Sequence, residues 1–288
     1  MNKLKIIITA LILCFFTFTV SMAQSSSECN KKGIDFYNKG EYKEAVYWFT
    51  RALEKDPKSA KLWFNKGNAC YKLAAYKSSQ EESYKAVEKE FKNAIDCYNK
   101  ALAYTREDST TILFNKAIAL FGLMSTSNEN RVKEEAKECL NKILKVNPEL
   151  KGLNINKNFI GGWSPISIAC ALGNEKLVEV LINKGVDVNS KRIDELDVSW
   201  TPLYSAGTKK IAELLIGAEA KVNIKNELGF TPLHTAVAKG FKDVVEVLLI
   251  NGAKTDVKDF YGYTPLESAK RNKNSAIIDL LIKYGAKE

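Results

Sequence analysis

The chain has 288 residues and a formal net charge of +9, with 45% hydrophobic and 27% charged residues. This balance, together with only 6 prolines and 16 glycines, is ordinary for a soluble globular protein and excludes collagen-like or disordered classes. The basic residues are spread over both halves of the chain without a run of five like charges. We therefore interpret them as a solvated surface and expect no nucleic-acid partner.

Residues 1–23 have the pattern of a secretory signal peptide. Lys3 and Lys5 precede an uncharged apolar run, Ile6 to Val20, and small residues lead up to Ala23. We expect cleavage between Ala23 and Gln24, and hence an exported protein, periplasmic or secreted, without stable membrane insertion. An uncleaved anchor is the alternative, although the run falls short of the ~20 residues that span a bilayer.

Five cysteines remain after the expected cleavage. Their number is odd, no CxxC pair is present and the chain has one histidine, so we expect no metal site. Each cysteine falls within a helical pattern and is interpreted as a small core residue, with one or two disulfides in an oxidising compartment as the alternative. They are Cys29, Cys70, Cys97, Cys139 and Cys170.

Residues 24–150, the first array, contain a repeated helical pattern. Tyr42–Leu53 and Phe91–Leu102 carry matching apolar stripes with small residues on them, and Gly33 and Gly67 are 34 residues apart. This pattern resembles the tetratricopeptide repeat (TPR) family, whose unit is a helix–turn–helix. We predict three repeats with insertions near 75–90 and 124–131. The first insertion is either a lengthened helix pair or a charged helical extension.

Residues 151–288, the second array, repeat a different unit. Four copies open with a Ser/Thr-Pro step, and the steps begin at Ser164, Thr201, Thr231 and Thr264. Thr231 and Thr264 are 33 residues apart, and the copies resemble the ankyrin repeat. The whole chain is thus predicted to be all-α, an α-solenoid of TPR-like hairpins followed by four ankyrin repeats, with the two arrays in one continuous body.

Two of these spacings are irregular. Thr201 and Thr231 are only 30 residues apart, which predicts a shortened first helix in the second copy. Ser164 and Thr201 are 37 residues apart, with the excess in 191–199, which predicts a longer finger loop before that copy.

Motifs of known catalytic chemistry are absent from the sequence. It has no GxGxxG, P-loop, HExxH or GxSxG pattern, and its one histidine, His234, stands in a Thr-Pro-Leu-His tetrapeptide that is structural in ankyrin repeats. We therefore predict a non-enzymatic protein without a cofactor.

Four aromatic residues stand immediately before the Ser/Thr-Pro steps: Trp163, Trp200, Phe230 and Tyr263. Resemblance to ankyrin repeats places this position near the surface that contacts partners, and aromatic side chains are enriched in binding hot spots. We predict that this column binds a partner, with Lys239 and Arg271 adding charge complementarity. Packing of the four rings into a stabilising ladder is the alternative.

Resemblance to TPR repeats implies a second groove in the first array, lined by the first helix of each pair. A clamp for a terminal carboxylate is disfavoured by the apolar residues there, and an extended or helical apolar peptide fits better. The predicted groove residues are Lys61, Phe64, Asn68, Tyr71, Phe114 and Phe121.

These features together predict an exported, monomeric scaffold or adaptor that binds protein or peptide partners. The alternatives are a secreted inhibitor or effector that regulates a target enzyme and, less favoured, an enzyme with an unrecognised site.

Overall fold

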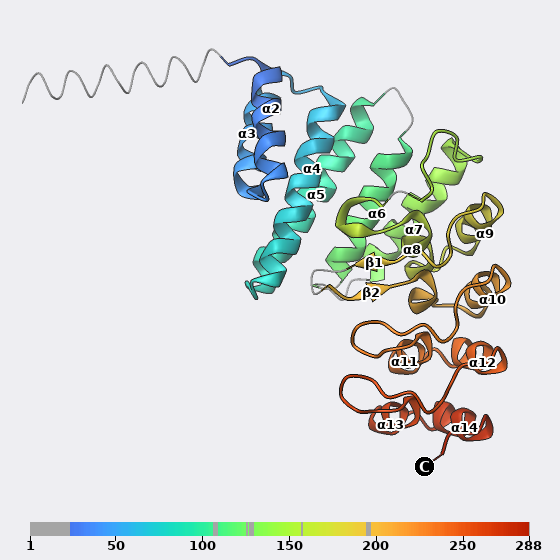
Figure 1. Cartoon of the computed structure of the whole chain (residues 1–288). Helices are drawn as coiled ribbons and strands as arrows, with labels where there is room; N and C mark the ends of the chain where they lie inside the picture. The colour runs from blue at the N-terminus through green and yellow to red at the C-terminus, as the bar shows by residue number, and fades with distance from the viewer. Residues whose placement is uncertain are drawn as a thin grey trace, which may run out of the picture.

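The computed structural model describes residues 24–105, 109–124, 126, 130–156, 158–193 and 197–287. These residues form a helical solenoid, confirming the predicted all-α class (Figure 1). The sheet in this part of the chain is one antiparallel hairpin of β1 (Arg192–Ile193) and β2 (Ser199–Trp200). The predicted signal segment, including Ala23, lies outside the described residues, which begin at Gln24. No helix among those described is long and apolar enough to cross a membrane.

The first array consists of three antiparallel helical hairpins in which each helix packs on the next. Its helices are α2 (Ser26–Asn38), α3 (Tyr42–Lys55), α4 (Ala60–Ser79), α5 (Tyr84–Tyr104), α6 (Thr110–Met124) and α7 (Asn130–Val146).

The segment around residues 75–90 is a lengthened helix pair, the first of the two alternatives. Helices α4 and α5 have 20 and 21 residues, and their tips are joined by an ion pair of 3.1 Å between Lys77 Nζ and Glu90 Oε1. Both side chains of this pair are largely shielded from solvent. The pair thus fixes the turn at the end of the hairpin.

Glycines let the helices of this array approach closely. A Cβ atom on Gly67 would lie 2.7 Å from the Tyr98 ring, and one on Gly33 would lie 2.6 Å from the Phe49 ring. Each glycine therefore leaves room for an aromatic ring of the neighbouring helix. This contact explains physically why small residues recur at the 34-residue spacing.

The second array repeats a short first helix and a slightly longer second helix. Ser164, Thr231 and Thr264 cap the first helices with their side chains, and a proline follows each at the first helical position. The elements are η1 (Ile160–Gly162), α8 (Pro165–Ala171), α9 (Glu175–Asn183), η2 (Pro202–Ser205), α10 (Lys209–Gly217), α11 (Pro232–Ala238), α12 (Lys242–Ile250), α13 (Pro265–Arg271) and α14 (Ser275–Lys283).

Both irregular spacings have the predicted effect. The second copy opens with η2, a 3₁₀ turn of four residues, where α8, α11 and α13 have seven. The longer loop before it forms the β1–β2 hairpin, and residues 194–196 of that loop lie outside the description.

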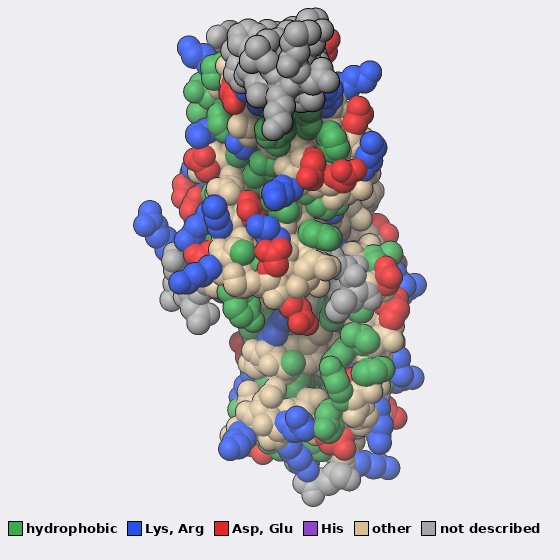
Figure 2. All heavy atoms as spheres, turned by 90° about the vertical axis from the view of Figure 1, so that its left-hand side faces the viewer, with side chains coloured by type: hydrophobic (Ala, Val, Ile, Leu, Met, Phe, Trp, Pro, Cys, Tyr) green, Lys and Arg blue, Asp and Glu red, His purple; other side chains and the backbone are tan. Residues whose placement is uncertain are grey.

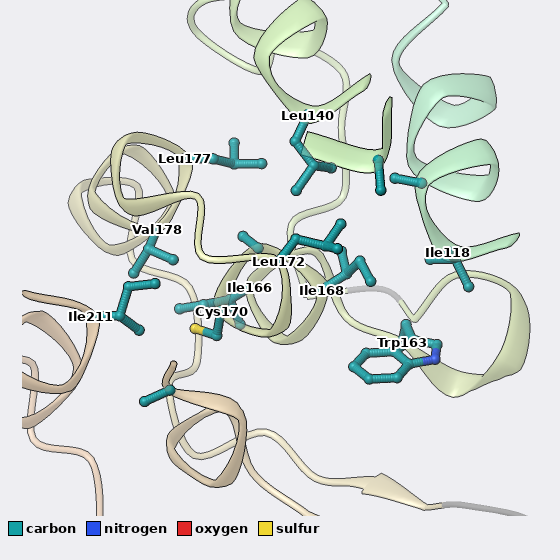
Figure 3. Close-up of a cluster of buried hydrophobic side chains, with 14 of the residues drawn as sticks. Ile118, Leu140, Trp163, Ile166, Ile168, Cys170, Leu172, Leu177, Val178 and Ile211 are labelled. Atoms are coloured by element: carbon teal, nitrogen blue, oxygen red, sulfur yellow. The ribbon is translucent and has the colours of Figure 1, made fainter. Parts of the chain in front are cut away.

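One hydrophobic core joins the two arrays. Helix α6 packs on α8 in the column of first helices, and α7 packs on α9 in the column of second helices. Figure 3 shows Ile118 of α6 and Leu140 of α7 facing side chains of α8 and α9. The same cluster of buried side chains extends from Cys70 to Ala286. The α6–α7 hairpin thus covers the end of the second array, and the two arrays pack as one body.

The five cysteines among the described residues are buried and are free thiols. The Cys70 and Cys97 thiols hydrogen-bond to each other between α4 and α5. Burial raises the pKa of Cys139 to about 11 and that of Cys170 further. All five therefore act as core residues in this structure.

His234 connects the third and fourth copies of the second array. Its Nδ1 accepts from the backbone N–H of Thr231 at 3.1 Å, which leaves Nε2–H to donate to the Tyr263 carbonyl at 3.3 Å. The side chain is 2% exposed, and this desolvation lowers its pKa. The charges of Asp259 and Lys225 act on the ring in opposite directions and are secondary to burial.

Replacing Gly67 by Ala should destabilise the protein by about 1–3 kcal/mol, because the added methyl group overlaps the Tyr98 ring. The control is Gly217→Ala in α10, where the Cβ atom meets open space. That change should leave stability equal or raise it by up to about 1 kcal/mol. Denaturant unfolding of both variants measures the difference, and equal effects would contradict the close approach.

Stability should fall as the pH is lowered from about 7.5 to about 5.5, because the unfolded chain takes up a proton on His234 near pH ~6.5 before the folded chain does. The contribution is thus present above the unfolded pKa and is lost below it. His234 is the only histidine in the chain. His234→Gln should flatten this part of the pH profile in denaturant unfolding, and an unchanged slope would disprove the assignment.

Candidate partner-binding groove

A groove of about 630 Å³ lies beside η2 and is bounded by α7 at one end and by the start of α12 at the other. This volume is in the range of sites that enclose a ligand or several side chains. A second hollow of about 670 Å³ adjoins it and shares Gly207, Thr208 and Phe241. The groove is lined by Phe121, Lys133, Lys137, Trp163, Ala171, Leu172, Gly173, Arg192, Trp200, Tyr204, Ser205, Gly207, Thr208, Thr235, Lys239 and Phe241.

The two irregularities of the second copy meet at this groove. The short η2 and the residues after it line the middle of the groove, where the regular copies have a longer helix. The extra residues of the finger loop bring Arg192 and Trp200 onto its wall. The groove is therefore formed by the two features that distinguish this copy from the others.

Trp163 forms a rigid part of the wall. Its ring is 8% exposed and contacts Phe121 of α6 edge to face, with 5.0 Å between ring centroids. The Arg192 guanidinium lies over the same ring, 4.2 Å from its centroid. This cation–π contact ties β1 to the junction of the two arrays.

Glu227 holds β2 in place from the next finger loop. Its carboxylate accepts from the Ser199 backbone N–H at 2.5 Å and from the Ser199 hydroxyl at 2.7 Å, and these bonds lower the pKa of Glu227 to about 2. Tyr204, on η2, donates its hydroxyl to the carbonyls of Ile224 and Phe230. Trp200 and Tyr204 pack edge to face at 5.3 Å, so this network also orients the aromatic wall.

The groove is positively charged. Four cations line it, Lys133 and Lys137 from α7, Arg192 from β1 and Lys239 after α11, and its lining among the described residues includes no carboxylate. Lys137 is paired with Glu134 on its own helix at 3.1 Å. Lys239 is accessible, but the nearby walls desolvate its ammonium group and lower its pKa. Glu175, on the rim of the adjoining hollow, is bonded to the Thr208 hydroxyl.

The predicted aromatic column is divided in the structure. Trp163 and Trp200 line the groove together with Lys239 and Phe121, whereas Phe230 and Tyr263 lie beyond it. Phe230 packs edge to face on His234 at 5.9 Å. Arg271 lies over the Tyr263 ring at 4.6 Å and donates to its hydroxyl at 2.8 Å, so these two predicted binding residues are partners of each other.

Part of the groove predicted in the first array is filled by the chain itself. Phe114 is fully buried and stacks on Phe159 with 4.8 Å between centroids, and Tyr71 lies against Gly161 of η1. Asn68 accepts from the Tyr98 hydroxyl and the Asn115 amide. Phe114 and Tyr71 are core residues that do not lie on an accessible surface, which corrects their predicted peptide contact, whereas Asn68 is half-buried. Of the remaining predicted residues, Phe64 is half-buried and Lys61 is exposed.

Arg192, Lys133, Lys137, Tyr204 and Phe241 belong to the groove and were not predicted from the sequence. The excess residues at 191–199 were the available signal for Arg192. The α7 lysines had no such signal, because α7 reaches the groove only through its packing on the second array. The described residues contain no group of three or more His, Cys, Asp or Glu side chains that could hold a metal ion.

Comparison with protein families identifies both arrays. The family model of ankyrin repeats (3 copies) matches residues 130–226 and 204–288, more than half of the chain. A TPR repeat model matches residues 33–73. The ankyrin match begins at α7, the helix predicted to close the third TPR-like repeat. This overlap agrees with the packing of α7 on α9.

Similar proteins match a segment of about a third of the chain. Alpha-latrotoxin-Lhe1a of Latrodectus hesperus is 35% identical over 95 residues, 32% of this chain and 6% of the toxin. Ankyrin repeat, SAM and basic leucine zipper domain-containing protein 1 of Homo sapiens is 30% identical over 93 residues, 31% of this chain and 19% of that protein. The chain thus spans less than a fifth of either relative.

Glu227→Gln should loosen the β1–β2 hairpin, because a neutral amide replaces the carboxylate that accepts both Ser199 bonds. We expect hydrogen exchange at the Ser199 amide to quicken about tenfold, the loss of a charge-assisted bond. Glu179→Gln, on the exposed face of α9, is the matched control and should leave that amide unchanged. Equal protection in both variants would show that Glu227 does not hold the hairpin.

Proposed function

Since this chain belongs to the ankyrin-repeat family and carries a TPR repeat ahead of its ankyrin repeats, we propose that it is an exported, non-enzymatic scaffold that binds a segment of a partner protein. Both repeat families are typically protein-interaction modules. Export is proposed from residues 1–23, with their basic start, apolar run and small residues before Gln24.

The observation that carries this proposal is the groove at the second copy. It combines cations with aromatic side chains whose orientations are fixed. This is the composition of a binding hot spot with a polar rim. Trp163 is held by Phe121 of the preceding repeat and Trp200 by Tyr204 of its own copy, so little side-chain entropy is lost when a partner binds. The exposed apolar side chains include Ile193, Phe260 and Tyr261 of the finger loops. Figure 2 shows hydrophobic side chains at the surface of one face of the molecule.

Site-specific photo-crosslinking in the cells that produce the protein tests this function. The photo-reactive residue p-benzoyl-phenylalanine is placed at Trp200 in the groove and, as a control, at Glu179 on α9. We expect a discrete adduct from position 200 and none from position 179, since a partner segment in the groove contacts the first and not the second.

The same crosslinked adducts also test where in the cell or outside it the protein acts. They should be recovered outside the cytoplasm, and mass spectrometry should find Gln24 as the N-terminal residue of the captured protein. Equal labelling from both positions, or none, would refute groove binding, and adducts that retain residues 1–23 inside the cell would refute export.

A further inference from the structure

The charge and shape of the groove specify its occupant more closely than the proposed function does. Its lining combines four cations with five aromatic rings, those of Phe121, Trp163, Trp200, Tyr204 and Phe241, and no carboxylate among the described residues lines it. A partner segment that buries apolar side chains there also brings its own charges near these cations. Carboxylates would be favoured and ammonium groups repelled.

Lys239 is the cation of the groove that is best placed to pair with an anion of a partner. Its ammonium group stands 6.0 Å from the centre of the Phe241 ring, and desolvation lowers its pKa. No ion pair links it to a carboxylate of the described residues, whereas Lys137 at the other end of the groove has Glu134. A partly desolvated cation gains more from a carboxylate partner than a fully hydrated one does.

The order of the elements places the charges on both sides of the aromatic wall. Lys133 and Lys137 come from α7, at one end, and Lys239 follows α11, at the other. Between them lie Trp163 with Arg192 above it, and then Trp200 packed on Tyr204. The hairpin α6–α7, the β1–β2 hairpin with η2, and α11 follow one another in this order along the solenoid (Figure 1).

We propose that the groove binds an acidic linear segment of a partner protein, in which Asp or Glu residues flank a bulky apolar residue. The apolar side chain contacts Trp200, and the flanking carboxylates pair with the α7 lysines at one end and with Lys239 at the other. This inference rests on the proposed scaffold function and adds the chemical class of the segment.

Selection from a display library of random 12-residue peptides against the full chain tests the preference. The selected peptides should be enriched in Asp and Glu on both sides of Trp, Phe or Leu. One such peptide, synthesised with capped ends and a fluorescent label, is then measured by fluorescence polarisation beside its Asn/Gln counterpart. The neutral peptide should bind about a hundredfold more weakly, because it loses a charge-assisted contact worth about tenfold at each end.

Variants of the protein test whether the preference for acidic peptides arises from the groove. Lys239→Gln should weaken binding of the acidic peptide about tenfold and leave binding of the neutral peptide unchanged. Lys239→Glu should reverse the preference toward a peptide with Lys in the flanking positions. Lys31→Gln, an exposed lysine on α2, is the matched control and should bind as the unmodified chain does.

The proposal is overturned if the selected peptides lack acidic residues, if none binds, or if Lys239→Gln binds the acidic and neutral peptides as before. Each of these outcomes is compatible with a specific adduct from position 200, so the acidic preference fails separately from the scaffold function. Loss of the adduct together with the peptides would remove both.

Discussion

A stack of helical hairpins has an apolar face at each end, and water must be kept from both. The α6–α7 hairpin meets this constraint for two arrays at once. On one side it packs on α5, and on the other α6 packs on α8 while α7 packs on α9. One end of the groove follows from this contact, because it brings Phe121 and the α7 lysines beside Trp163. The first array is thereby a structural part of the binding surface of the second.

The groove arises because one repeat departs from the regular pattern. Three copies of the second array open with a helix of seven residues, and the 3₁₀ turn η2 of the remaining copy leaves space between its neighbours. The preceding loop uses its extra residues to carry Arg192 and Trp200 into that space, where Glu227 fixes the strand. Shortening and lengthening within one copy act together, which explains how a regular scaffold acquires a single specific site.

The sequence was sufficient for the repeats, because the glycine spacing and the Ser/Thr-Pro steps report local contacts such as Gly67 against Tyr98. The 30- and 37-residue spacings also located η2 and the hairpin. Sequence reasoning failed at Tyr71 and Phe114, which are covered by residues 159–161, a segment without helical periodicity. It also missed Lys133 and Lys137, since their place in the groove depends on how α7 stacks on α9. Local patterns predict the units, and only the packing between units shows which surfaces remain accessible.

The contact of Phe159 with Phe114 has a further consequence for the first array. Residues 159–161, which follow α7, cover Phe114 and Tyr71, where an external peptide was expected to bind. This part of the array is therefore already occupied by a segment of the same chain. Tethering gives such a segment a high effective concentration, and a free peptide would have to displace it to bind the same side chains. At Phe114 and Tyr71, the surface of the TPR-like hairpins therefore serves the internal assembly of the two arrays.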